Sequence, residues 1–162
     1  MENRKNIVTI SPNEGRPLSM AGGNYRIVIS GRETGGEFAI IEMSVPSGAG
    51  ANPHSHENMV ESFYVLEGEI TFQSEAGSYV ASKGSLINIP KGDLVHCFKN
   101  KTDKPAKLLC TVMPAGLDDL FIEASDYLIN NINDSENDRR VKLSSIAEKF
   151  GNKLYPVNYF EV

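Results

Sequence analysis

The chain's three histidines fall in two short stretches of sequence, together with a glutamate that could share a metal ion with them. His54 and His56 are separated by one residue and are followed by Glu61, whereas His96 lies further along the chain. Imidazole and carboxylate groups are ligands for divalent transition metals, so this set predicts a single metal site. A lone buried histidine is more often a hydrogen-bonded core residue, but a His-x-His pair followed by a glutamate favours a metal site.

The spacing of the first three candidates has a geometric consequence. Alternate side chains of an extended strand share a face, so His54 and His56 point the same way. Glu61 lies an odd number of positions after His56, and a regular strand would turn it to the opposite face. We therefore predict a turn or bulge in residues 57–60, where the sequence is polar. Glu57, the rival carboxylate, is then a solvated loop residue.

The strand that follows this turn carries an apolar face. Glu61, Phe63 and Val65 alternate, so they would share the inner face, and in the second stretch Phe98 shares a face with His96. Phe63, Val65 and Phe98 would line an apolar pocket suited to an aromatic or lipophilic compound. Ordinary core packing of the same three side chains remains the alternative.

The second stretch supplies the last imidazole from a separate pair of strands. Pro90 and Gly92 interrupt the apolar pattern, which predicts one strand over residues 86–89 and the next over residues 95–100. His96 therefore reaches the first three candidates only if the two stretches lie side by side in the fold.

Both stretches resemble the paired motifs of the cupin superfamily. Residues 48–68 follow its pattern of Gly, five residues, His-x-His, four residues, Glu, six residues, Gly; residues 84–100 follow Gly, five residues, Pro-x-Gly, then His, three residues, Asn. The second stretch departs once, because three residues instead of two separate Gly92 from His96. That insertion turns His96 to the wrong face unless a bulge absorbs it, and the regular spacing to Asn100 indicates that the register recovers.

The resemblance implies an all-β cupin jelly roll, a barrel or sandwich, with an α-helical extension at the C-terminus. We expect an N-terminal arm in residues 1–24, a cupin domain in residues 25–115 and the helical extension, packed on the barrel, in residues 116–162. One copy of the motifs resembles single-domain cupins. Strand-like runs with turn signals between them agree with this fold and lie at residues 25–30, 37–45, 62–66, 69–73, 78–81 and 106–113.

The C-terminal extension shows the spacing of amphipathic helices. A first helix is predicted from residue 117, behind Asp118 and Asp119. An Asn-rich loop is expected at residues 130–137. A second, short helix is expected to align Leu143, Ile146, Ala147 and Phe150 and to end at Gly151, and Ser145 and Glu148 are a candidate capping box.

Composition limits the class of protein. With 162 residues and 17.8 kDa the chain is sized for one domain. A net charge of -5 disfavours nucleic acid, and no apolar run predicts a signal peptide or membrane span. A cytoplasmic protein is the simplest inference, with Cys97 and Cys110 as reduced structural thiols. Single-domain cupins commonly pair, so the resemblance also implies a homodimer.

The resemblance further implies the ligand set and a range of functions. His54, His56, Glu61 and His96 would hold a divalent transition metal, Fe, Mn, Ni, Cu, Co or Zn. The leading hypothesis is a metal-dependent dioxygenase similar to quercetin dioxygenase, acting on a small oxygen-rich or aromatic molecule. In it Glu61 binds the metal or accepts the substrate proton. The alternatives are a non-enzymatic cupin that binds a small molecule or sugar, and a metal-dependent isomerase or decarboxylase.

Overall fold

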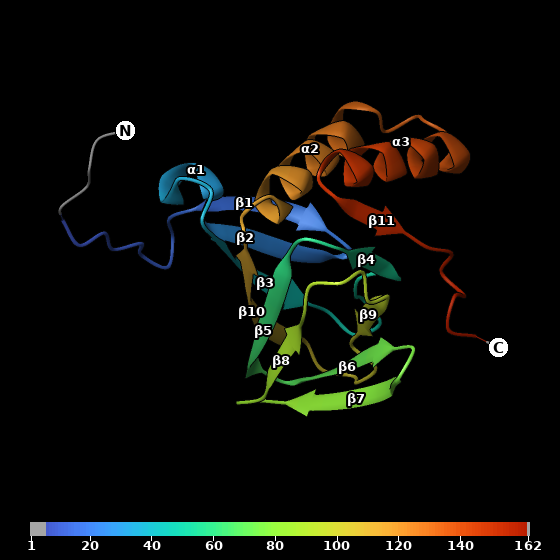
Figure 1. Ribbon diagram of the computed structural model, residues 1–162, viewed down its shortest axis with the longest axis horizontal. Coiled ribbons are helices and arrows are strands. Elements are labelled where there is room, and N and C mark those ends of the chain that lie inside the picture. Colours follow the sequence, from blue (N-terminus) through green and yellow to red (C-terminus); the bar gives the residue numbers. More distant parts are fainter. Residues whose placement is uncertain (1–5, 162) are drawn as a thin grey trace.

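Two antiparallel β-sheets pack face to face in the computed structural model, which describes residues 6–161, and two helices cover one end of them (Figure 1). The six-stranded sheet has the order β1 (Arg16–Met20), β2 (Gly23–Ile29), β3 (Ala39–Val45), β10 (Ala106–Met113), β5 (Val60–Glu67) and β8 (Leu86–Ile89). The five-stranded sheet has the order β11 (Asn152–Leu154), β4 (His54–His56), β9 (His96–Lys99), β6 (Glu69–Ser74) and β7 (Gly77–Ser82). The predicted all-β fold is confirmed.

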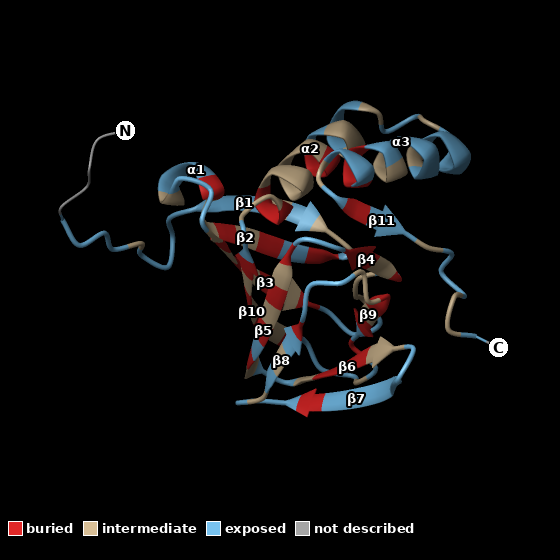
Figure 2. Cartoon of the chain, viewed as in Figure 1, coloured by how far each residue is buried: buried red, intermediate tan, exposed pale blue. Residues whose placement is uncertain are grey.

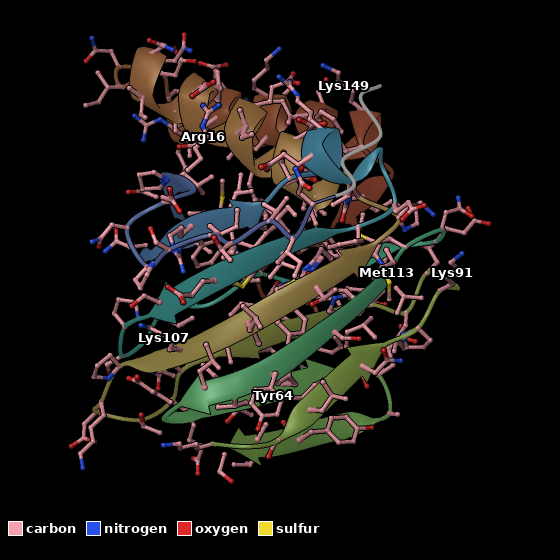
Figure 3. All side chains as sticks on the ribbon, turned by 90° about the vertical axis from the view of Figure 1, so that its left-hand side faces the viewer. Arg16, Tyr64, Lys91, Lys107, Met113 and Lys149 are labelled. Atoms are coloured by element: carbon pink, nitrogen blue, oxygen red, sulfur yellow. The ribbon has the colours of Figure 1, made fainter. Side chains whose placement is uncertain are left out.

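The core lies between the sheets because their strands alternate in polarity. Every second residue of β3 is buried, and β10 repeats the alternation beside it. Buried residues alternate with less buried ones along these strands (Figure 2). On the outer face of the six-stranded sheet, Tyr64 is 44% exposed, as its parity in β5 predicts (Figure 3).

The N-terminal part of the chain differs from the arm expected over residues 1–24. Residues 16–20 form the edge strand β1, paired with β2 through a tight turn at Ala21 and Gly22, both of which have positive φ. Leu18 and Met20 pack against the core from this strand. The strand is mostly exposed and contains Pro17, which is tolerated at a sheet edge, so its sequence carries little strand signal. Residues 1–5 lie outside the described residues.

The C-terminal helices confirm the predicted helical extension, but the second helix begins earlier than predicted. Helix α2 (Leu117–Asn130) begins where predicted. Helix α3 (Glu136–Lys149) begins well before the predicted capping box, at Ser135, whose hydroxyl accepts a hydrogen bond from the backbone N–H of Asp138. Ser145 and Glu148 therefore lie inside the helix. The early turns of α3 are polar, and only Ile146 and Ala147 are buried, so periodicity detects the second half alone.

Two shorter elements have no clear signal in the sequence. The single-turn helix α1 (Gly31–Thr34) begins at a capping box formed by Ser30 and Glu33. Strand β11 follows α3 and adds an edge to the five-stranded sheet beside β4. Within residues 6–161, no helix combines the length and apolarity needed to cross a bilayer.

Candidate metal centre

The four predicted ligands converge from three strands. His54 and His56 come from β4, Glu61 from β5 and His96 from β9, and one ligand atom of each lies within 4.8 Å of the others. The convergence follows from strand pairing, because His54 lies opposite His96 where β4 meets β9. The imidazole centroids of this pair are 4.3 Å apart, and that of His56 is 5.0 Å from that of His96.

The predicted turn after β4 brings Glu61 inward. Residues 57–59 leave the strand before β5 begins, and Glu57 is exposed, as expected of a loop carboxylate. Glu61 is only 2% exposed and faces the imidazoles, while its strand neighbour Ser62 turns outward. The change of face that the odd spacing requires is therefore made in this turn.

The extra residue of the second motif is absorbed before β9. Asp93 has φ of +66°, a left-handed conformation uncommon for residues other than glycine. This kink restores the register, so that His96, Phe98 and Asn100 are all buried whereas Lys99 is exposed. His96 thus points inward, which resolves the alternative that the insertion left open.

Each imidazole has one nitrogen engaged by a backbone carbonyl. The Nδ1 atoms of His54, His56 and His96 lie 2.7, 3.0 and 2.9 Å from the carbonyl oxygens of Asn52, Met59 and Leu94. A carbonyl oxygen can only accept, so each Nδ1 carries the proton and donates it. In the neutral imidazoles the Nε2 atoms are therefore bare lone pairs, the form in which histidine binds metals.

These lone pairs meet a negative charge. The Nε2 atoms of His56 and His96 lie 3.1 and 3.3 Å from the same carboxylate oxygen, Oε2 of Glu61. The nitrogen lone pairs and the carboxylate oxygen repel each other unless a positive charge lies between them. That charge is either a second proton on an imidazole or a metal cation. The donor set therefore fits a divalent ion, which one carboxylate and three neutral imidazoles would leave with one net positive charge.

The pKa values reflect the same arrangement. Burial, followed by the neighbouring His96, lowers the pKa of His54 from 6.5 to about 4. Burial also acts to lower the pKa of His56, but the hydrogen bond and charge of Glu61 outweigh it and leave that pKa raised. Burial opposes ionisation of Glu61, yet the surrounding imidazoles outweigh it and hold its pKa below the usual 4.5. Glu61 is thus an anion at neutral pH.

Access to the cluster differs among its members. His56, Glu61 and His96 are at most 2% exposed, whereas His54 is partly exposed. The cluster is therefore least covered on the side of His54.

A buried thiol, which we expected to be structural, contacts the other oxygen of the carboxylate. Cys110 is fully buried, and its Sγ lies 3.5 Å from Oε1 of Glu61, as a donor. Burial, together with the charge of Glu61, raises the pKa of this thiol well above its usual value. The regular alternation of β10 places Cys110 inward, opposite Phe63 in β5, so parity could have indicated the contact.

The three apolar pocket candidates all lie in the core, and one of them, Phe98, also lines a pocket. Phe63 and Val65 are at most 1% exposed and belong to the core, where the rings of Phe63, Phe72 and Phe98 have centroids 5.1 to 5.5 Å apart. This placement matches the core packing that the sequence left open for Phe63 and Val65. Phe98 lines a pocket of about 540 Å³.

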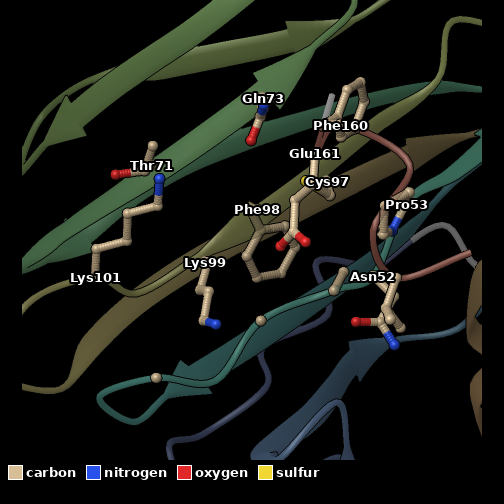
Figure 4. A pocket seen from close by; sticks show the side chains of 14 residues that line it. Asn52, Pro53, Thr71, Gln73, Cys97, Phe98, Lys99, Lys101, Phe160 and Glu161 are labelled. Atoms are coloured by element: carbon tan, nitrogen blue, oxygen red, sulfur yellow. The ribbon is translucent and has the colours of Figure 1, made fainter.

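That pocket is separate from the ligand cluster, because none of its lining residues belongs to the cluster. It is bordered by Cys97 and Lys99 of β9 and by Phe160 and Glu161 of the C-terminal segment (Figure 4). Sequence reasoning did not anticipate it, because the strand and the C-terminal segment are far apart along the chain.

Comparison with known proteins places this geometry in a family. Residues 41–112, which include all four candidate ligands, match the model of the cupin domain. Quercetin 2,3-dioxygenase of Bacillus subtilis (strain 168) is 29% identical over 86 residues, which cover 53% of this chain and 25% of that enzyme. The chain thus matches only a quarter of the length of this relative.

Solved structures share the fold. The crystal structure of a predicted oxalate decarboxylase from Thermotoga maritima is similar with a TM-score of 0.58 and 21% identity, over 67% of this chain and 99% of that one. A cupin sugar phosphate isomerase from Silicibacter pomeroyi gives a TM-score of 0.52 and 24% identity, over 59% of this chain and 61% of that one. The matching domain model, the fold and the position of the His-His-Glu-His cluster lead to one conclusion: the chain contains a cupin domain, matched over residues 41–112.

Proposed function

We propose that this protein is a metal-dependent, dioxygenase-type enzyme acting on a small oxygen-rich or aromatic molecule. One observation carries the proposal: one ligand atom from each of three imidazoles and from one carboxylate lie within 4.8 Å of one another, and the three imidazoles donate Nδ1–H to backbone carbonyls, which leaves Nε2 as the metal-binding nitrogen. The similarity to quercetin 2,3-dioxygenase supports oxygenase chemistry for this site.

His54, His56, His96 and Glu61 would hold the ion, and Fe, Mn, Ni, Cu, Co and Zn are the candidates. When bound, such an ion supplies Lewis acidity and a template for the reactants. The protein supplies the remaining functions. Glu61, an anion at neutral pH, would either bind the ion or accept a proton from a substrate hydroxyl, and the substrate would approach from the less covered side, at His54.

Two other kinds of function use the same residues differently. An acid–base isomerase that relies on a free histidine is disfavoured, because all three histidines of the chain belong to the cluster. A binding protein that holds a small molecule or sugar without turnover would use the ion only as an anchor. Turnover separates this binding protein from the enzyme.

The test begins with elemental analysis of the purified protein, followed by reconstitution with each of the six metals. Oxygen uptake is then measured with a panel of flavonols, catechols and diketones. We expect uptake that depends on a redox-active metal, that is lost in Glu61→Ala and that persists in Cys97→Ser, whose side chain lies in β9 next to His96 but turns away from the cluster. Saturable ligand binding without uptake for any combination would contradict the enzyme and favour the binding protein.

A homodimeric, cytoplasmic protein belongs to the same proposal. Tyr64 and Leu86 lie opposite each other on β5 and the edge strand β8, and they are 44% and 66% exposed, so a second copy would bury apolar surface there. The free thiols of Cys97 and Cys110 suit a reducing compartment. Sedimentation velocity should give a dimer that Tyr64→Lys converts to a monomer; a monomeric wild type would contradict this part of the proposal.

A further inference from the structure

Asp93, the residue at the kink before β9, joins segments that surround the metal cluster. Its Oδ1 accepts a hydrogen bond of 2.6 Å from the hydroxyl of Ser55, and its Oδ2 accepts one from the ammonium group of Lys153. Its backbone N–H donates to the carbonyl oxygen of His56 at 3.3 Å. One side chain and its own amide therefore connect the approach to β9 with both β4 and β11.

Ser55 is the residue through which this connection reaches the candidate ligands. It lies between His54 and His56 in β4 and is fully buried, with 0% of its surface exposed. Strand parity turns its side chain away from the two imidazoles. Its hydroxyl also lies 3.2 Å from that of Tyr155. A hydrogen bond to Ser55 fixes the strand from behind, and with it the direction of both imidazoles.

Lys153 brings the C-terminal segment into the same arrangement. It pairs with Ser55 in the register of β11 against β4, so that β4 is covered on the side away from β9. The Lys153–Asp93 pair is largely exposed, with side chains 57% and 31% accessible, and ion pairs of this kind contribute little by themselves. The Ser55–Asp93 hydrogen bond, which reaches a buried hydroxyl, is the stronger constraint.

We propose that Asp93 is a positioning residue for the metal centre: its carboxylate holds β4 against the segment that leads to His96, and so keeps the imidazoles at the spacing that one ion requires. This inference rests on the metal site proposed above. Metal sites depend on outer residues that fix the orientation of the ligands, and loss of such a residue weakens metal binding by about 10- to 100-fold. Asp93, which absorbs the extra residue of the second motif, would therefore both restore the strand register and position the ligands.

Three substitutions separate the carboxylate from the backbone kink. Asp93→Gly keeps the left-handed conformation available and removes the carboxylate. Ser55→Ala removes the donor and leaves residue 93 intact. Asp93→Asn tolerates the same conformation and keeps an oxygen that can accept from Ser55. The matched control is Lys149→Met, which breaks a lysine–carboxylate pair of 2.6 Å with Glu123 between α3 and α2.

Co(II) affinity is measured for each full-length protein by competition with a chromophoric chelator, and the visible spectrum of the Co(II) form reports the ligand geometry. We expect Asp93→Gly and Ser55→Ala to bind about 10-fold more weakly with an altered spectrum. Asp93→Asn and Lys149→Met should resemble the wild type. The spectrum matters because a loss of stability alone would not change the geometry around a bound ion. If the Asp93→Gly protein does not fold, Ser55→Ala still tests the inference, because it removes the other partner of the same hydrogen bond.

Wild-type affinity and spectrum in both Asp93→Gly and Ser55→Ala would overturn the inference and leave the metal site standing. Equal weakening in Lys149→Met would also overturn it, since the effect would then be general. A wild-type protein that binds no ion would instead overturn the metal site itself, and the role of Asp93 with it.

Discussion

His54 and His96 face each other across the junction of β4 and β9, with their ring centroids 4.3 Å apart. This pairing joins two motifs that are distant in the sequence, and it places His54, a partly buried residue, beside His96, which is 1% exposed. Since both Nδ1 atoms donate to backbone carbonyls, both Nε2 atoms are free to bind one ion.

Removing one of these imidazoles should reduce metal affinity. We expect His96→Ala to weaken metal binding by at least about 100-fold, because loss of a direct ligand costs more than loss of the outer residues that orient it. Isothermal titration or chelator competition measures the change. Cys97→Ser is the neighbouring control in the same strand, and it should bind as the wild type does. Similar affinities for the wild type and His96→Ala would exclude His96 as a ligand.

The metal-free protein should lose stability as the pH falls from about 6.5 to about 4. The pKa of His54 is lowered to about 4 in the folded protein, against 6.5 as its ordinary value, so the unfolded chain binds a proton in this range that the folded protein does not. The free energy of unfolding therefore decreases as the pH is lowered from about 6.5 to about 4. His56 has the opposite effect at higher pH, because its pKa is raised in the folded protein. Its contribution to the free energy of unfolding is fully present below pH 6.5 and is lost as the pH rises through the pKa of the folded protein.

Urea unfolding at several pH values measures this dependence, and NMR titration of the imidazoles assigns it. The signals of His54 should remain those of the neutral ring well below pH 6, while His56 should titrate above its ordinary value. The substitution His54→Asn should make the free energy of unfolding less dependent on pH between about pH 4 and pH 6.5. A pKa near 6.5 for His54 would contradict its burial next to His96.

A core role for Phe63 predicts a large cost in stability. Phe63→Ala should lower the free energy of unfolding by about 3 to 5 kcal/mol, because it leaves a cavity among packed rings. Tyr79→Ala, on the exposed side of β7, should cost much less, about 1 kcal/mol or below. Urea unfolding compares the two variants. A Phe63→Ala variant of nearly unchanged stability would return Phe63 to the lining of a ligand pocket.

The sequence predicted the convergence of the four candidate ligands, because their positions follow from strand parity and motif spacing. His54, His56 and Glu61 needed only the period of a strand and one turn. The position of His96 depended on Asp93, whose left-handed backbone absorbs the insertion, and a non-glycine residue in that conformation has no sequence signal.

Other features depend on partners that periodicity cannot identify. Strand β1 is exposed and contains a proline, and β11 is a short strand recognised only by its pairing with β4. The first half of α3 has no apolar face, so it read as a loop. Alternation places Phe63 inward without saying whether a ring or a ligand lies beside it, and here rings do.

The most direct test of the metal centre is the position of a bound ion. Crystals grown with Mn or Co should give one anomalous scattering peak about 2.0 to 2.2 Å from the Nε2 atoms of His54, His56 and His96 and from the Glu61 carboxylate. A peak elsewhere, or a metal-saturated crystal with no peak among these four side chains, would contradict the account.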